Sequence, residues 1–161
     1  MRVLKLGGTS VGNASRIRGV ADLVARVARE GEPVLVVVSA VGGVTDTLVR
    51  GAAAAATGEP VEPWVDGFRA IHRQILMELA DEIGPGAFEE AAAGLAGLAR
   101  EQEDLLRGIG LLREQPPGAV AHLCSLGERA SALLMHRLLD ARGLAPKAIM
   151  PSRWVRPAAV G

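Results

Sequence analysis

The chain has 161 residues, of which 49% are hydrophobic and 22% charged; these proportions are usual for a globular domain and exclude disorder and collagen-like architecture. Its 18 basic and 18 acidic residues balance, with no long block of like charge, so there is no electrostatic footprint for nucleic acid or an anionic membrane. Aromatic residues make up only 2%, which excludes base-stacking surfaces and predicts a core of small and aliphatic side chains.

No targeting, membrane or metal signal stands out. The longest apolar runs, "PVLVVVSAV" and "GAAAAATG", fall far short of the roughly 20 residues that span a bilayer, and the N-terminus lacks a signal-peptide core. We therefore expect a cytoplasmic protein. The single cysteine, Cys124, is expected to be a buried structural thiol. His72, His122 and His136 lack ligand spacing and are expected to be ordinary surface or partly buried histidines, so no metal site is predicted.

The first half of the chain repeats one pattern. Residues 2–6, "RVLKL", alternate in polarity and predict a short strand. A glycine turn follows, and apolar residues from Ile17 to Val27 predict a helix that starts near Asn13 and stops by Gly31. The β-branched run at 33–40 predicts a strand buried on both faces of a parallel sheet. The turn "VGGVTD" then leads into a second helix, "TLVRGAAAAATG", and this repetition favours an α/β doubly wound fold.

The second half is predominantly helical in its pattern. Apolar spacing predicts a helix over 64–83, which "GPG" at 84–86 ends, and another over 87–113. A third helix is predicted for "SLGERASALLMHRLLDARG", residues 125–143, and "APKAIM", residues 145–150, predicts a third strand. The expected organisation is one domain with a helical insertion at about 60–117 and a small, largely parallel sheet.

The stretch "KLGGTSVG", residues 5–12, is the first candidate site, because ligands of α/β sheets bind at the carboxyl ends of strands. Gly7 and Gly8 allow backbone N–H groups to approach an anion, Lys5 can supply a charge, and Thr9 and Ser10 can add hydroxyl donors. The lysine precedes the glycines, unlike in the Walker and Rossmann fingerprints. The alternative is an ordinary turn beside a solvent-facing lysine.

Two further motifs admit two interpretations each. Ser39 and Thr45 flank the second glycine turn and could bind a substrate carboxylate, although Thr45 or Asp46 could instead cap the following helix. Ser125 and Glu128 fit the capping-box pattern S-x-x-E. Alternatively, Glu128 faces the strand ends and pairs with a substrate ammonium.

Three segments together resemble the aspartate kinases of the amino acid kinase family: "VLKLGGTSVG", "VVVSAVGGVTDTL" and "LGERASALLMHRLLDARG". Their order and separation match the N-terminal lobe of that family over essentially all 161 residues. The first motif is specific, and the joint occurrence of the three is a strong signal. The resemblance implies a three-layer α/β/α sandwich of which this chain is the N-terminal lobe.

The resemblance also implies an activity and a set of roles. The family transfers the γ-phosphoryl group of Mg-ATP to the β-carboxylate of L-aspartate, the first step of lysine, threonine and methionine biosynthesis. By motif, Lys5 would neutralise the transferring phosphoryl group in a loop lined by Gly7, Gly8, Thr9 and Ser10. Such electrostatic positioning suits phosphoryl transfer. Ser39 and Thr45 would hold aspartate carboxylate oxygens, and Glu128 would accept from the α-ammonium.

The sequence departs from the family in two places. Leu6 stands where many relatives have phenylalanine, which keeps an apolar strand residue. The family's second half, with its catalytic aspartate, its adenine and Mg²⁺ sites and the ACT domains that usually follow, is not found in these residues, and Arg156 receives no role. We therefore expect a lobe with little or no kinase activity by itself. Its parent is expected to be a homo-oligomer, either monofunctional or fused to a second enzyme of the pathway.

Two rival functions remain at this stage. One is a related small-molecule kinase with another acceptor, such as acetylglutamate, glutamate, carbamate or a nucleotide. The other is a non-catalytic module that binds a metabolite or completes a subunit interface. The acceptor specificity of the parent would decide the first, and the effect of Lys5→Ala on turnover would decide the second.

Overall fold

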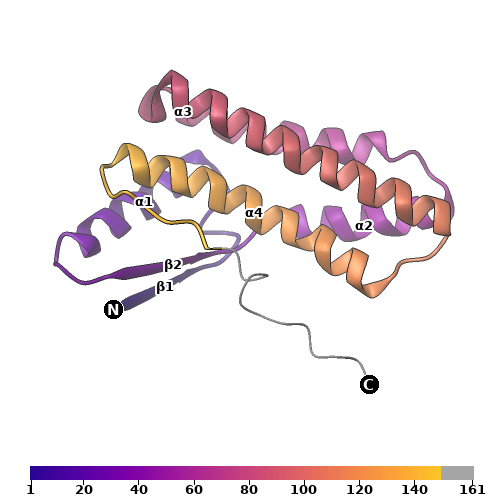
Figure 1. Ribbon diagram of the computed structural model, residues 1–161, viewed down its shortest axis with the longest axis horizontal. Coiled ribbons are helices and arrows are strands. Elements are labelled where there is room, and N and C mark those ends of the chain that lie inside the picture. Colours follow the sequence, from indigo (N-terminus) through magenta and orange to yellow (C-terminus); the bar gives the residue numbers. More distant parts are fainter. Residues whose placement is uncertain (150–161) are drawn as a thin grey trace.

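A computed structural model describes residues 1–149 of the chain. In chain order the elements are β1 (Arg2–Leu6), α1 (Ala14–Ala28), β2 (Val34–Val38), α2 (Val44–Thr57), α3 (Glu62–Leu112) and α4 (Pro117–Ala141). Figure 1 shows the two strands and α1 at one end of the molecule, while α3 and α4 run along its length, with the kink of α3 and the end of α4 near α1, and α2 packs against them at the other end. The described part is thus mixed α/β and mostly helical.

The strands pair in parallel, with Leu6 opposite Val38. Between them, α1 starts where the sequence predicts, because the Asn13 side chain accepts a hydrogen bond from the Arg16 backbone N–H at 2.9 Å and so caps the helix. The chain then turns at Gly31, whose φ of 87° suits glycine. The predicted β-turn-α repeat is confirmed.

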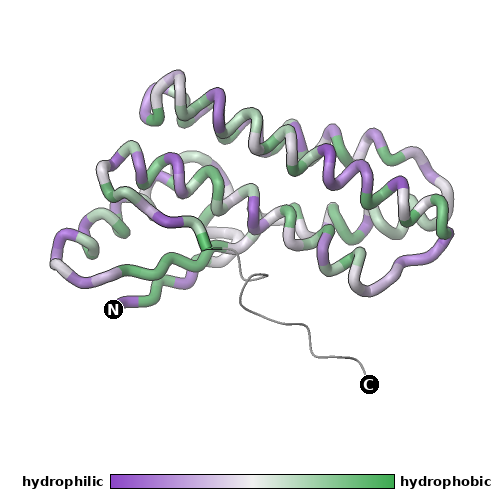
Figure 2. Tube along the Cα trace, viewed as in Figure 1, coloured by the Kyte–Doolittle hydropathy of each residue, from purple (hydrophilic) through white to green (hydrophobic). Residues whose placement is uncertain are grey.

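Helices cover only one face of this small sheet. Leu4, Leu6 and Val36 pack against the core, whereas Val3, Leu35 and Val37 on the opposite face are 57%, 37% and 43% exposed. Figure 2 shows how hydrophobic β2 is along its length. The prediction that the second strand is buried on both faces is therefore wrong within residues 1–149, and these residues form two layers, not three. The β-branched run reflects strand propensity, which does not reveal how many layers surround a strand.

The predicted third strand at 145–150 is also wrong for residues 145–149, which form no strand; Met150 lies outside the described residues, as does Arg156. Ala145 has a φ of 44°, which breaks an extended backbone, and Pro146 has no N–H to donate to a ladder. The apolar pattern of "APKAIM" gave no sign of this local conformation.

The long helix α3 is in fact two helices. Gly84 interrupts it with φ 78° and ψ 163°, so the predicted helices on either side of "GPG" are confirmed. Trp64, near the start of α3, packs against α2 where Gly51 removes a side chain; a Cβ there would lie 3.2 Å from the Trp64 Cγ. The alanine- and glycine-rich sequence of α2 therefore allows close helix packing.

The start of α4 was not predicted. This helix begins at Pro117, eight residues before the expected start at Ser125, because proline is well tolerated in the first helical turn. Ser125 lies inside the helix and donates its hydroxyl hydrogen to the His122 carbonyl at 2.7 Å. The capping-box interpretation of Ser125 and Glu128 is therefore wrong.

A charged network joins α1 to the end of the first half of α3 and the end of α4. Arg18 and Arg142 both contact Glu82, and Arg142 also pairs with Asp22 at 2.8 Å. The hydrogen bond from Arg18 is the main reason that the pKa of Glu82 lies below its usual value, and Arg142 adds to the effect while partial burial opposes it. This network holds the kink of α3 and the end of α4 against α1.

Gly84→Ala is expected to lower the free energy of unfolding by about 1–3 kcal/mol, because its φ and ψ fall in a region that is essentially restricted to glycine. Gly86→Ala is the matched control, since Gly86 has open space around it and no positive φ. Urea unfolding of both variants measures the difference. Equal stability of the two variants would contradict the strain at Gly84.

The free energy of unfolding is also expected to decrease as the pH decreases, because of His72. This histidine is fully buried, not on or near the surface as predicted: its ring lies 4.2 Å from Phe68, its Nδ1 is 2.8 Å from the Phe68 carbonyl, and its Nε2 has no hydrogen-bond partner among residues 1–149. Burial lowers the pKa of His72 below 6.5, although the Phe68 hydrogen bond opposes the shift. The unfolded chain therefore binds the proton more readily.

The contribution of His72 to stability is thus complete above pH 6.5 and is lost as the pH falls below that value towards the lower folded-state pKa. Urea unfolding across this range measures it. His72→Gln keeps a hydrogen-bond donor without titrating, so the variant is expected to show a flatter pH profile. An unchanged profile would assign the acid sensitivity to other groups.

Candidate functional site

The ends of the two strands bring the first two motifs together. Because β1 and β2 are parallel and in register, their carboxyl ends lie at the same edge, where the Ser39 backbone N–H donates to the Leu6 carbonyl at 3.0 Å. Both α1 and α2 begin just beyond this edge. Two helix N-termini, each with a positive dipole end, therefore point to one region, as in many anion sites.

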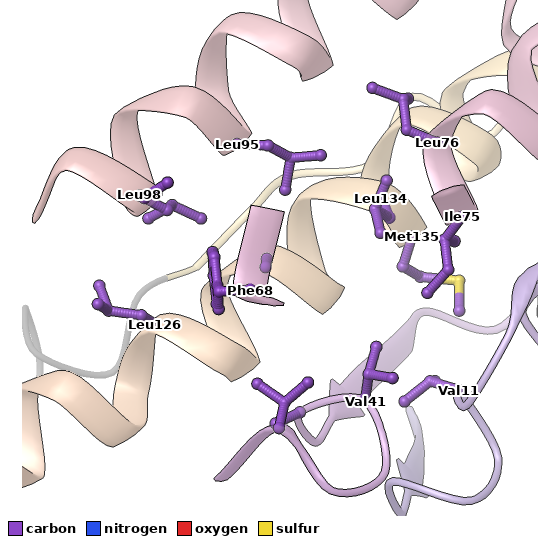
Figure 3. Packing of buried hydrophobic residues seen from close by; sticks show 14 of the residues in the cluster. Val11, Val41, Phe68, Ile75, Leu76, Leu95, Leu98, Leu126, Leu134 and Met135 are labelled. Carbon is purple, nitrogen blue, oxygen red and sulfur yellow. The ribbon is translucent and has the colours of Figure 1, made fainter. Parts of the chain in front are cut away.

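The two glycine loops also touch each other directly. A Cβ on Gly8 would lie 2.8 Å from the Ala40 carbonyl oxygen and 3.4 Å from the Gly42 Cα. Such a distance leaves no room for a side chain, so Gly8 is required for the contact between the loops. Figure 3 shows Val11 and Val41, one from each loop, in the same hydrophobic cluster as Ile75 and Met135 of the helices. Both loops are thus anchored in the hydrophobic core.

Gly7, Thr9 and Ser10 belong to the loop that makes this contact, whereas Lys5 lies near the end of β1, on the exposed face that also carries Val3. Lys5 and Thr9 are exposed, and Gly7 has nothing within 4 Å of its Cβ position. Ser10 is half-buried, and its N–H donates to the Gly7 carbonyl at 2.8 Å to close the turn. Within residues 1–149 the Lys5 ammonium forms no ion pair. The loop therefore combines an open glycine backbone with a nearby cation that has no partner there, a combination that can accommodate a phosphate.

The second motif provides half-buried hydroxyls at the same edge. The backbone cap of α2 is Gly43, with φ 82° and no side-chain hydrogen bond. Thr45 and Asp46 lie in the first turn, so the prediction that either caps the helix is wrong. Ser39 and Thr45 are both half-buried. Their hydroxyls form no hydrogen bond within the described chain that would commit them to a structural role.

The third motif joins the other two through α4. Gly127 is buried, and a Cβ on it would lie 2.7 Å from the Ala40 Cβ and 3.1 Å from the Val44 Cγ1. The next residue, Glu128, is exposed and follows directly on this contact. Gly8, Ala40 and Gly127, which are distant in the sequence, therefore meet around Ala40, and Glu128 is the residue next to this contact in α4.

The Glu128 carboxylate also influences a neighbouring thiol. Cys124 is one helical turn earlier and is half-buried, not fully buried as predicted. Burial, together with the negative charge of Glu128, raises the pKa of the Cys124 thiol. A raised pKa favours the protonated, less reactive form of the thiol.

Sequence reasoning overlooked the two small residues at the centre of this arrangement. Ala40 and Gly127 lie within the recognised motifs, but neither offers a chemical group that would draw attention. A glycine inside a helix costs about 1 kcal/mol relative to alanine, and that unfavourable choice was the available signal for a packing role at Gly127.

A separate surface pocket of about 540 Å³ lies between the second half of α3 and the start of α4. Leu105, Ile109 and Leu112 line it together with the charged side chains of Glu101 and His122, and Glu101 also pairs with Arg129 at 2.7 Å. None of the predicted site residues borders this pocket. The pocket is formed by α3, α4 and the segment between them, away from the three motifs.

Neither a metal cluster nor a membrane span is found in the described chain. Residues 1–149 contain no group of three His, Cys, Asp or Glu side chains that could hold a metal ion. No helix of that region is long and apolar enough to cross a bilayer.

Comparison with solved structures places this fold among aspartokinases. Escherichia coli aspartokinase III in complex with lysine and aspartate superposes with a TM-score of 0.73 at 27% identity, over 89% of this chain and 30% of that one. The same enzyme with aspartate and ADP gives 0.71 at 30% identity, over 89% and 29%. Clostridium acetobutylicum aspartate kinase shares the fold at a TM-score of 0.59 and 18% identity, over 86% and 29%.

Sequence comparison points the same way. Over 48 residues, 30% of this chain and 12% of the relative, the chain is 53% identical to an aspartokinase of Geobacillus stearothermophilus. The chain spans about 30% of the length of the solved relatives. The model of the amino acid kinase family matches residues 1–159. That match extends over almost all of the sequence, and the chain therefore belongs to the amino acid kinase family.

Proposed function

We propose that this chain forms the aspartate-binding and phosphate-binding part of an aspartate kinase. The observation that carries the proposal is the meeting of three motifs around Ala40, at the carboxyl ends of two parallel strands. The aspartokinase relatives, one of which was solved twice with aspartate bound, favour this acceptor over others in the family. The proposed protein is a cytoplasmic homo-oligomer that serves amino-acid biosynthesis.

In the proposed reaction, an oxygen of the β-carboxylate of L-aspartate attacks the γ-phosphorus of ATP. A new O–P bond forms, the bond from the γ-phosphorus to the β,γ-bridging oxygen breaks, and ADP leaves with that electron pair. Lys5 would balance the charge of the transferring group, while Gly7, Gly8, Thr9 and Ser10 orient the phosphate. We assign Mg²⁺ no ligand among residues 1–149, where no acidic cluster exists to hold it.

The acceptor would be held by three side chains: one that follows β2, one in the first turn of α2 and one in α4. Ser39 and Thr45 would donate hydroxyl hydrogens to carboxylate oxygens of aspartate, and Glu128 would accept hydrogen bonds from its α-ammonium. Loss of the capping alternatives supports this assignment, because neither Thr45 nor Glu128 has the structural task that the sequence allowed. A charge-assisted hydrogen bond of this kind gives both affinity and selectivity for an amino acid.

The exposed sheet face belongs to the same proposal. Val3, Leu35 and Val37 form an apolar surface on the face opposite the helices. In the three-layer sandwich expected for the complete kinase, a further layer would cover this surface, and the nucleotide half would bring the adenine site. The family's second half would thus complete both the fold and the active site.

Lys5→Ala is expected to lower kcat on the order of 10³-fold, since it removes a charge that acts on the transition state. The measurement is aspartate-dependent ADP release by the protein at its full natural length. Lys147→Ala is the control, because Lys147 is the other lysine of the sequence, is exposed and lies after α4, outside the three motifs. Unchanged turnover of Lys5→Ala would favour the non-catalytic module.

Glu128→Gln is expected to raise the KM for L-aspartate by about 10-fold or more, because the lost interaction is a hydrogen bond between charged groups. Asp140→Asn, at the far end of the same helix and exposed, should leave KM unchanged. The same assay with acetylglutamate as acceptor tests the rival kinase. A preference for that acceptor, or a KM for aspartate that ignores Glu128, would contradict the proposed substrate.

A further inference from the structure

Gly127 occupies a position where helix propensity alone would select another residue. It lies in the interior of α4, where glycine costs about 1 kcal/mol relative to alanine. The residues around it, Leu123, Leu126 and Ala130, are completely buried. The helix is thus pressed against the core on both sides of Gly127, and the absence of a side chain there calls for a packing reason.

That reason is the second glycine loop. A methyl group on Gly127 would lie 2.7 Å from the Ala40 Cβ, closer than carbon atoms approach without displacement. It would also lie 3.1 Å from the Val44 Cγ1 at the start of α2. Only hydrogen on Gly127 lets α4 approach the loop to its present depth.

Ala40 has no room to retreat. At its carbonyl oxygen, Gly8 approaches so closely that a Cβ there would lie 2.8 Å from that oxygen. Ala40 is 3% exposed and is therefore enclosed by the phosphate loop and by α4. A methyl group added to Gly127 would therefore push α4 away from the second loop, since Ala40 is already packed tightly against Gly8.

We propose that Gly127 is a positioning residue: its contact with Ala40 sets the distance between α4 and the second loop, and so the place of Glu128 relative to Ser39 and Thr45. The inference rests on the proposed function, in which these three side chains hold aspartate. Gly127 touches no substrate in this account. It acts through the next residue, whose carboxylate would move with any shift of the helix.

The selective prediction concerns the α-ammonium of the substrate. Gly127→Ala is expected to raise the KM for L-aspartate on the order of 10-fold, because the displaced Glu128 no longer meets the ammonium in good geometry. The Ki of succinate, a dicarboxylate without an ammonium, should stay unchanged as a competitive inhibitor. A general loosening of the fold would instead weaken both ligands.

Rescue tests the contact itself. In the double variant Gly127→Ala with Ala40→Gly, one methyl group is moved across the same contact, and the KM for aspartate should return most of the way to the original value. Gly67→Ala is the control, because Gly67 lies inside α3 with nothing within 4 Å of its Cβ position. That variant should leave KM and Ki as they are.

The outcomes distinguish the role of Glu128 from the role of Gly127. If Glu128→Gln leaves the KM for aspartate unchanged, the proposed role of Glu128 fails. If Glu128→Gln raises KM but Gly127→Ala does not, or if KM and Ki rise together, or if the double variant shows no recovery, the positioning role fails. Should Gly127→Ala not fold, Ala40→Gly alone provides the readout: the gap it opens at the same contact should raise KM a few-fold without changing Ki, and an unchanged KM would overturn the inference.

Discussion

Close approach of three chain segments around Ala40 is the constraint on which the site depends. Gly8 approaches the carbonyl oxygen of this residue and Gly127 approaches its Cβ, both at distances that exclude any side chain, so the two glycine loops and α4 have fixed positions relative to one another. Tight packing of this kind transmits small displacements because protein interiors are nearly incompressible. Polar groups on exposed or half-buried positions can thus hold a definite geometry without hydrogen bonds among themselves.

The helical unit adds a second, electrostatic connection to the sheet layer. Glu82 lies two residues before the break at Gly84 and accepts contacts from Arg18 of α1 and Arg142 beyond α4. Isolated surface ion pairs contribute little, but a carboxylate shared by two guanidinium groups forms a network. The break places the end of one helix where this network can form, and α3 and α4 then extend alongside α2 as a bundle.

Local signals predicted the elements well and their surroundings poorly. Asn13 correctly predicted the start of α1, and "GPG" correctly predicted the break in α3, because caps and special backbone angles depend on nearby residues. The start of α4 at Pro117 was predicted too late, because apolar spacing begins further along the chain. The predicted strand at Ala145 is absent, because the positive φ of this residue has no sequence signature. Burial of β2 on a single face could not be predicted, because the number of layers depends on segments distant in the chain.

The placement of Trp64 also makes the fold visible to spectroscopy. This side chain packs against Gly51 of α2, and the Arg50 guanidinium lies 5.6 Å from the centre of its ring. The chain has no tyrosine, and the second tryptophan, Trp154, lies outside the described residues. Intrinsic fluorescence of a Trp154→Phe protein therefore reports on one contact, so separation of α2 from α3 can be followed in solution without an attached dye.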